Sequence, residues 1–316
     1  MERSVISRAI FLRITASSSN NGDNIFGAVN ICILVILCLI MLYPLYFTVI
    51  ASVSEPINVA TGKVTFWPEG FTWDAYKEVF KQGAIWTGYR NAIINTILGT
   101  IWNLFLTIPA AYAMSKTKMR FHGALSIFFA ITMFFSGGLL PYFLLVKNLG
   151  LMNKPYTLII LGGFSVFNMV VARTYFQTSI PETLYDAAEI DGCSQFGQFF
   201  KIALPLAKPI IAVIALYYAV GRWNDYFTSA IFISNSDYYP LQLVLRDILI
   251  NSRMALASIN AKTMTAEQIL YLTRQAYMAE AMKYAIIFIA SLPLLIAYPF
   301  VQKHFVKGVM VGSVKG

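Results

Sequence analysis

The sequence predicts an all-α integral membrane protein with six transmembrane helices. Of the 316 residues, 58% are hydrophobic and only 12% are charged. An ordinary soluble domain carries roughly twice that share of charge, so these charges are too few to cover a water-facing surface. Apolar stretches of about 20 residues, the length that a helix needs to cross the hydrocarbon layer, recur along the chain. Lipid is therefore the expected solvent for most of the protein.

Six apolar stretches qualify as spans. They are Ala28–Val53, Asn91–Ser115, Ala124–Val146, Thr157–Phe176, Leu206–Phe232 and Lys283–Val301. The first is nearly free of charge, and no cleavage site of small residues interrupts it, so we expect a retained span and not a signal peptide. The third contains Gly137, Gly138 and Pro141, which predict a break or kink. Such breaks are tolerated where neighbouring helices or a cavity satisfy the freed backbone groups.

Six spans, together covering a membrane domain of residues 28–301, place alternate connections on opposite sides. One side receives the longer polar segments 54–90 and 234–282, and the other receives residues 1–27, 116–123, 177–205 and 302–316. The short segments of the second side carry scattered Lys and Arg residues such as Arg3, Lys116 and Lys307. The positive-inside rule therefore favours two cytosolic termini, with 54–90 and 234–282 as external loops.

The composition and motifs argue against nucleic-acid binding and against catalysis. The net charge is +9, but the basic residues form no stripe that could follow a phosphate backbone. His122 and His304 lie far apart, and no nucleophile–base pair or metal cluster is evident. Gly192 and Gly197 have the spacing of a P-loop, but Gln198 occupies the position where that loop requires lysine. We expect no enzyme activity, no cofactor and no metal in this chain.

The stretch from Pro181 to Pro209 carries the most information. Pro181 and Glu182 are typical of a helix start, and Asp191-Gly192 indicates a sharp turn. An amphipathic piece then leads to Leu204-Pro205 at the entry of the fifth span. The pattern predicts a helix–turn–helix elbow on the membrane face. Its first helix would present a flat surface of small residues flanked by acids.

This stretch resembles the EAA loop of ABC-importer permeases. That loop has an acid, two alanines, three residues, a glycine, nine residues and then Ile-x-Leu-Pro. The matching residues are Asp186, Ala187, Ala188, Gly192, Ile202, Leu204 and Pro205. Asp186 stands where the family usually has Glu, so an ion pair with the ATPase has one methylene less reach, and Glu189 is a candidate substitute.

The resemblance extends over nearly the whole chain after about Val29. GRWNDYF (221–227) and the terminal YPFVQKHFVKGVMVGSVKG (298–316) look like MalG-type carbohydrate permeases. FFSGGLLPYFLLVKNLGLMNKPYTLII (134–160) looks more narrowly like the LplC/YtcP branch, which imports oligosaccharides derived from polysaccharides. The resemblance implies a type I ABC-importer permease fold in the bacterial cytoplasmic membrane. Residues 177–205 would then be the cytosolic coupling loop.

The same resemblance implies the partners. They are a second homologous permease subunit, a cytosolic ABC ATPase dimer that binds ATP and Mg, an extracytoplasmic solute-binding protein and an oligosaccharide. The segment 234–282 would contact the binding protein, or else form a solvated cap. The basic tail 307–316 would reach the ATPase interface, or else remain a free end. Transport would proceed by alternating access.

Polar residues within the spans allow two interpretations. Arg222 and Asp225 could pair and hold the fifth span against its neighbours. Alternatively, Asp225 could line a sugar path, with Trp223 as a stacking surface and Asn224 as a hydrogen-bond donor. Asn168 could line the same path or bridge helices, which contributes only about 0.6 kcal/mol.

A different class of transporter is the main alternative. An ion-coupled secondary transporter without an ATPase partner should show acids deep within spans and internal repeats. Asp225 is the only acid well within a predicted span, and no convincing repeat is evident. The sequence therefore favours the ATP-driven importer.

Overall fold

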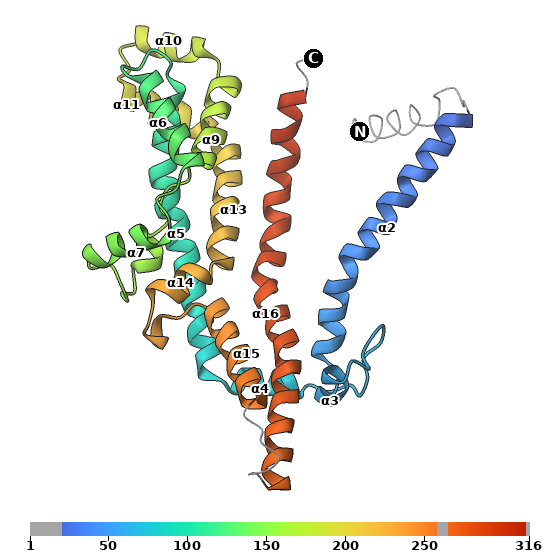
Figure 1. Cartoon of the computed structure of the whole chain (residues 1–316). Helices are drawn as coiled ribbons and strands as arrows, with labels where there is room; N and C mark the ends of the chain where they lie inside the picture. The colour runs from blue at the N-terminus through green and yellow to red at the C-terminus, as the bar shows by residue number, and fades with distance from the viewer. Residues whose placement is uncertain (1–20, 258–264, 314–316) are drawn as a thin grey trace.

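The computed structural model describes residues 21–257 and 265–313, and this part of the chain contains helices and no strands (Figure 1). The α-helices are α2 (Asn21–Ser52), α3 (Pro56–Ala60), α4 (Asp74–Lys81), α5 (Gly83–Ser115), α6 (His122–Phe134), α7 (Leu139–Asn148), α8 (Thr157–Ile160), α9 (Val166–Ser179), α10 (Glu182–Ile190), α11 (Gln195–Gln198), α12 (Leu204–Leu206), α13 (Lys208–Asn224), α14 (Phe227–Phe232), α15 (Leu241–Ala257) and α16 (Ala266–Ser313). A π-helical turn, η1 (Phe199–Ala203), and a 3-10 turn, η2 (Ser236–Tyr238), complete the fold.

Three of these helices are long and apolar enough to cross a membrane unbroken. They are α2, α5 and the part of α16 up to Ile296. Two bent pairs also pass the length and composition test: α6 with α7, at 110°, and residues 195–206 with α13, at 78°. The described residues thus hold three unbroken spans, or up to five if each bent pair counts as one. The expected number of six spans, of which the third was predicted to be broken, is therefore not confirmed by these residues.

The differences lie in the third, fourth and fifth predicted spans. The predicted break in the third is confirmed, because α6 ends at Phe134 and Gly138 precedes α7 with a φ of 84°. The fourth, Thr157–Phe176, is wrong as one continuous helix, because residues 161–165 separate α8 from α9. The fifth, Leu206–Phe232, is interrupted between α13 and α14. Apolar composition alone does not distinguish a helix from an irregular buried segment, which explains both errors.

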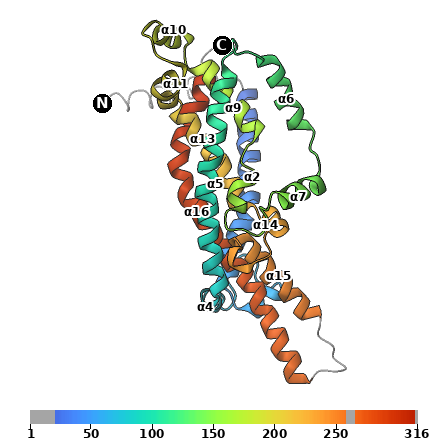
Figure 2. The ribbon, with the colours of Figure 1, turned by 90° about the vertical axis from the view of Figure 1, so that its left-hand side faces the viewer.

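The chain nevertheless passes back and forth between two ends of the bundle (Figures 1 and 2). The elbow helices α10 and α11 lie toward the same end as the start of α2 and the end of α16. The opposite end holds α3, α4 and α15. Within the described residues, the elbow, the start of α2 and the end of α16, which the sequence assigned to one side, therefore lie toward one end.

The segment 234–282 is largely helical in its described part. It contains η2, α15 and the first turns of α16, and α15 packs along α16 as they extend away from the bundle (Figure 2). Similarly, α16 continues to Ser313, so the tail expected after residue 302 is the end of this helix as far as the structure describes it. Which side of the membrane each segment faces stays a prediction.

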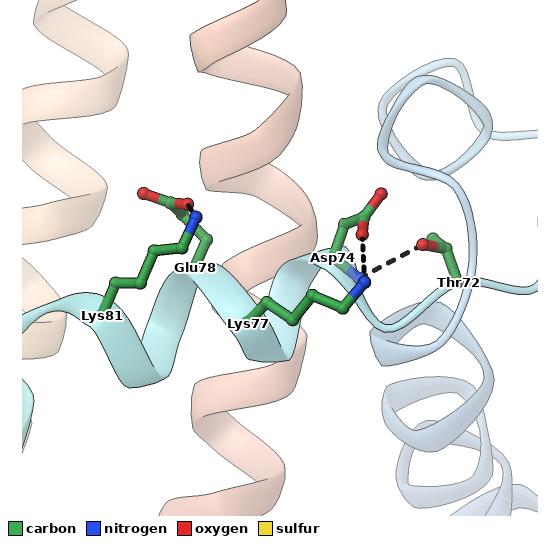
Figure 3. Close-up of polar contacts among 5 residues, drawn as sticks. All are labelled: Thr72, Asp74, Lys77, Glu78 and Lys81. Carbon is green, nitrogen blue, oxygen red and sulfur yellow. Dashed lines mark hydrogen bonds and ion pairs between the residues drawn. The ribbon is translucent and has the colours of Figure 1, made fainter.

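At that opposite end, α4 is a surface helix (Figure 3). Ala75 and Val79 are buried in a core shared with α16, while Lys77 and Lys81 reach back three residues to Asp74 and Glu78, with each N–O distance 3.2 Å. The hydrogen bond from Lys77, and then the one shared with Thr72, hold the pKa of Asp74 below its ordinary value. Exposed pairs of this kind add little to stability, so α4 is held mainly by its apolar face.

Two large hydrophobic clusters form most of the core, and two small ones, around Ile50 and Val146, add to it. Of the large clusters, the one nearer the elbow joins α5, α9, α10, η1 and α13, and includes Tyr112, Phe176, Tyr185, Phe199 and Tyr218. The other, at the opposite end, joins α4, α5, α13, α15 and α16. Both large clusters contain residues of α5 and α13, so these two helices connect the elbow to the far end of the protein.

Candidate functional site

The elbow consists of α10, a tight turn and the run α11–η1–α12. The backbone N–H of Cys193 donates to the carbonyl of Ala188 at 2.8 Å, and that of Gly192 donates to the carbonyl of Glu189 at 3.0 Å. This pair of bonds is a Schellman ending, which requires a residue with positive φ. Gly192 supplies it with a φ of 75°. The sharp turn predicted at Asp191-Gly192 is confirmed.

The residues that match the EAA pattern differ in exposure. Asp186, Ala187, Glu189, Gly192 and Pro205 are exposed, Ile202 and Leu204 are half-buried, and Ala188 is buried. The expectation that both alanines form an open surface is therefore wrong for Ala188. The helical period puts it on the same face as Tyr185, which packs into the core. Ala187, next to Asp186, remains available on the outer face.

The outer surface of the elbow also carries exposed apolar side chains. Ile190 is 87% exposed, Phe196 80% and Phe200 60%, and Leu184 is exposed as well. The sequence placed Phe196 and Phe200 on an amphipathic piece, but it did not single out Leu184 or Ile190. A helical wheel centred on the buried Tyr185 would have found them. Exposed apolar groups outside a lipid-facing span are typical of an interaction surface.

The inner face of the elbow rests on the end of α5. The ammonium of Lys116 lies 3.1 Å from the centroid of the Tyr185 ring and 5.2 Å from that of Tyr112. The Tyr112 ring lies 5.0 Å from Phe199 and 5.7 Å from Phe176. Aromatic contacts thus tie together α5, α9, α10 and η1.

Burial shapes the electrostatics of this contact. It lowers the pKa of Lys116, while Glu182, Asp186 and Glu189 act in the opposite direction. Burial also raises the pKa of Tyr185 to about 12, so its ring is neutral at physiological pH. Lys118 forms an exposed ion pair with Glu182 at 3.9 Å.

A second polar centre lies within the bundle, around Arg222 of α13. Its Nε donates to Asn103 Oδ1 at 3.0 Å, and its terminal nitrogens donate to the carbonyls of Leu158, Ile159 (3.2 Å) and Gly162 (3.4 Å). These carbonyls belong to the end of α8 and the break that follows it. Arg222 therefore satisfies the backbone where the fourth predicted span is interrupted.

The suggested Arg222–Asp225 pair is not what the structure shows. Asp225 instead accepts a hydrogen bond from the backbone N–H of Thr228 at 3.0 Å and so caps the start of α14. Gly99 of α5 makes room for the guanidinium, since a Cβ there would lie 3.0 Å from Arg222 Nε. Arg222 holds span five against its neighbours, as one interpretation expected, but through different partners.

The other suggested path residues occupy different environments. Trp223 is buried, donates from Nε1 to the carbonyl of Ala290 at 3.0 Å and meets Tyr89 edge-on, so its ring is not an open stacking surface here. Asn224 is exposed, and its amide donates to the carbonyl of Val220 at 2.9 Å. Asn168 is buried in the first turn of α9, where its N–H meets the capping hydroxyl of Ser165. A path role for these residues stays a prediction.

Three comparisons bear on this geometry. The family model described as "Binding-protein-dependent transport system inner membrane component" matches residues 83–311. Protein LplC of Bacillus subtilis is 38% identical over 94% of this chain and 97% of its own. The polygalacturonan/rhamnogalacturonan transport system permease protein YtcP of the same organism is 36% identical, over 90% and 96%. A chain in the crystal structure of a bacterial ABC transporter involved in the import of the acidic polysaccharide alginate superposes with a TM-score of 0.80, at 32% identity, over 92% of this chain and 100% of that one.

Proposed function

The chain belongs to the family of binding-protein-dependent transport system inner membrane components, and we propose that it moves oligosaccharides derived from polysaccharides into the cell. It is a permease subunit of an ABC importer in the cell membrane, and not an enzyme. The expected similarity to the LplC/YtcP branch is confirmed. These matches do not favour the ion-coupled alternative.

The oligosaccharide substrate is supported by the relatives. YtcP is named for the transport of polygalacturonan and rhamnogalacturonan, and the similar solved structure for the import of alginate, so both names refer to polysaccharides. The partners follow from the family, which depends on a binding protein and, as part of an ABC importer, on an ATPase. ATP and Mg would bind to the ATPase and not to this chain. A second homologous permease would complete the membrane part.

The mechanism that this arrangement supports is alternating access. The ATPase dimer closes on ATP and displaces the exposed face of α10 and its turn, where Asp186, Ala187, Glu189 and Gly192 lie. Ile202, Leu204 and Pro205 carry the displacement into α12 and α13. The observation that carries this proposal is the elbow itself, which is exposed on its outer face and packed into the core on its inner face.

Transport in proteoliposomes tests the function. We expect the chain, assembled with its ATPase, second permease and binding protein, to take up oligosaccharides of polygalacturonan, rhamnogalacturonan or alginate only when ATP is present. Omission of the ATPase should abolish uptake. Sugar uptake by this chain without the ATPase would overturn the proposal.

Docking of the ATPase is tested at Ile190. Burying an isoleucine side chain contributes about 1.5–3 kcal/mol, so we expect Ile190→Ser to weaken binding of the ATPase by roughly tenfold or more. Ile57, on α3 at the opposite end, is 47% exposed and provides the matched control. Ile57→Ser should leave ATPase binding unchanged in a pull-down titration. Equal binding by both variants would contradict docking at the elbow.

The topology has six passes and cytosolic termini. Three passes are the unbroken helices, and α6–α7, α8–α9 and α13–α14 are the interrupted ones, with 54–90 and 234–282 outside and 177–205 and 302–316 inside. The elbow, the start of α2 and the end of α16 lie toward the same end of the bundle, which supports this topology (Figure 1).

Cysteine labelling tests this topology. In a chain whose three cysteines are replaced by serine, we expect Ser236→Cys to react with a membrane-impermeant maleimide on intact cells. Thr183→Cys, on α10, should react only after the membrane is opened. The reverse pattern would place the elbow outside and refute the orientation.

A further inference from the structure

Two cavities flank the contact between α10 and α5. The larger, of about 590 Å³, extends from Tyr112 and Ala113 of α5 to Phe196 and Phe199 of the elbow. The smaller, of about 240 Å³, lies on the side of Ser115 and Gln177. Lys116, Lys118, Glu182 and Tyr185 line both of them. These four side chains therefore lie between the two cavities and connect α10 to the end of α5.

Among these four side chains, the stack of Lys116 on the Tyr185 ring is the closest contact. The ammonium sits 3.1 Å from the ring centroid, whereas the Lys118–Glu182 pair is 3.9 Å apart and exposed. A cation over a partly desolvated aromatic face is attracted by the ring quadrupole, while an exposed ion pair contributes little. Lys116 lies at the C-terminal end of α5, so the stack joins α10 to the end of that long helix.

The ring faces, and not the hydroxyl groups, make this contact. Tyr185 and Tyr112 are each 7% exposed, and in the part of the chain that the structure describes neither hydroxyl has a hydrogen-bond partner. The two ring centroids lie 6.1 Å apart, and Tyr112 in turn contacts Phe176 and Phe199. Tyr112 thus supports the stack from behind and connects it to the core.

We propose that Lys116 and Tyr185 are positioning residues that transmit the movement of α10 to α5. This inference rests on the proposed function, because it assumes that an ATPase displaces the elbow. Packed side chains scarcely compress, so a force applied to α10 passes through the contact that fills the gap. On either side of the Lys116–Tyr185 contact the cavities leave a gap between α10 and α5, so the contact is the place where force passes to α5. Since α5 belongs to both large hydrophobic clusters, its displacement reaches the opposite end of the protein.

The test compares two pairs of variants in the complete transporter in proteoliposomes. Tyr185→Leu removes the ring, whereas Tyr185→Phe removes only the unpartnered hydroxyl. Lys116→Met removes the cation, whereas Lys116→Arg keeps a cation that stacks on aromatic rings. The readouts are subunit stoichiometry, basal ATP hydrolysis, and its stimulation by sugar-loaded binding protein.

We expect Tyr185→Leu and Lys116→Met to reduce the stimulation about fivefold or more, the lower range of coupling between distant sites. Basal hydrolysis and stoichiometry should stay unchanged, and Tyr185→Phe and Lys116→Arg should behave as the wild type. Full stimulation of ATP hydrolysis in Lys116→Met, or in an assembled Tyr185→Leu complex, would overturn the proposed role of the Lys116–Tyr185 contact. If the Tyr185→Leu complex does not assemble, the comparison of Lys116→Met with Lys116→Arg tests the proposal, because Lys116 is only half-buried. A wild-type complex without stimulation would instead refute the proposed function.

Discussion

Gly192→Pro is expected to abolish the stimulation of ATP hydrolysis by sugar while leaving the membrane complex assembled. Proline holds φ near −65°, whereas Gly192 has a φ of 75°. The substitution also removes the N–H that donates to the carbonyl of Glu189. The Schellman ending of α10 cannot form, so the helix loses its fixed direction relative to α11. The rest of the bundle does not depend on this turn, because Gly192 is exposed.

The measurement is the ratio of stimulated to basal ATP hydrolysis in proteoliposomes. We expect a decrease of at least about tenfold, which requires the loss of only about 1.4 kcal/mol of coupling. Gly192→Asn is the matched control, because asparagine tolerates positive φ and a Cβ at this position meets no atom within 4 Å. It should retain most of the stimulation. A Gly192→Pro complex with the wild-type ratio would contradict a role of the turn in coupling.

The second large effect is expected at Arg222. Arg222→Met keeps an unbranched apolar chain but removes the guanidinium that donates to Asn103 and to the carbonyls at the end of α8. The carbonyl of Gly162 keeps one donor, the side-chain amide of Asn103. Two of these acceptors belong to buried residues, Asn103 and Leu158, and would be left without this donor. Each unsatisfied buried polar group costs about 1–3 kcal/mol, so the loss of stability should be on the order of 3 kcal/mol or more. We expect a clearly lower unfolding temperature of the purified protein in detergent.

Asp225→Asn is the informative comparison for Arg222. If the two residues stabilised the protein as an ion pair, both substitutions would reduce the unfolding temperature by similar amounts. Asparagine can still accept the hydrogen bond from the N–H of Thr228 through its side-chain oxygen. We therefore expect Asp225→Asn to lose much less stability than Arg222→Met. Equal losses would favour the ion pair and contradict the network described above.

The predictions that succeeded depend on short-range information. The turn at Gly192 follows from two adjacent residues, and the break before α7 from Gly137, Gly138 and Pro141. The family follows from the spacing of a few residues between Asp186 and Pro205. Each of these signals lies within a single stretch of chain, so it can be found without knowing what packs against it.

The predictions that failed depend on neighbours distant in sequence. Arg222 donates to Asn103, 119 positions away, and to the carbonyls around Ile159, 63 positions away. A hydropathy reading of Thr157–Phe176 has no access to these partners, so it extended one helix through a break that the guanidinium stabilises. The contact of Trp223 with the carbonyl of Ala290, 67 positions away, is likewise not indicated by the sequence, and a role of Trp223 in a sugar path stays a prediction.

The sequence by itself determined that this is an all-helical membrane permease with an elbow of defined turn geometry. The low share of charged residues indicates that lipid is the solvent, and the adjacent Asp191 and Gly192 specify the turn of the elbow. Only the tertiary structure decided which alanine faces outward, how the broken spans are satisfied, and that Lys116 rests on Tyr185. Those features arise where separate helices meet, and a helix can present its residues in many ways until its neighbours exclude all but one.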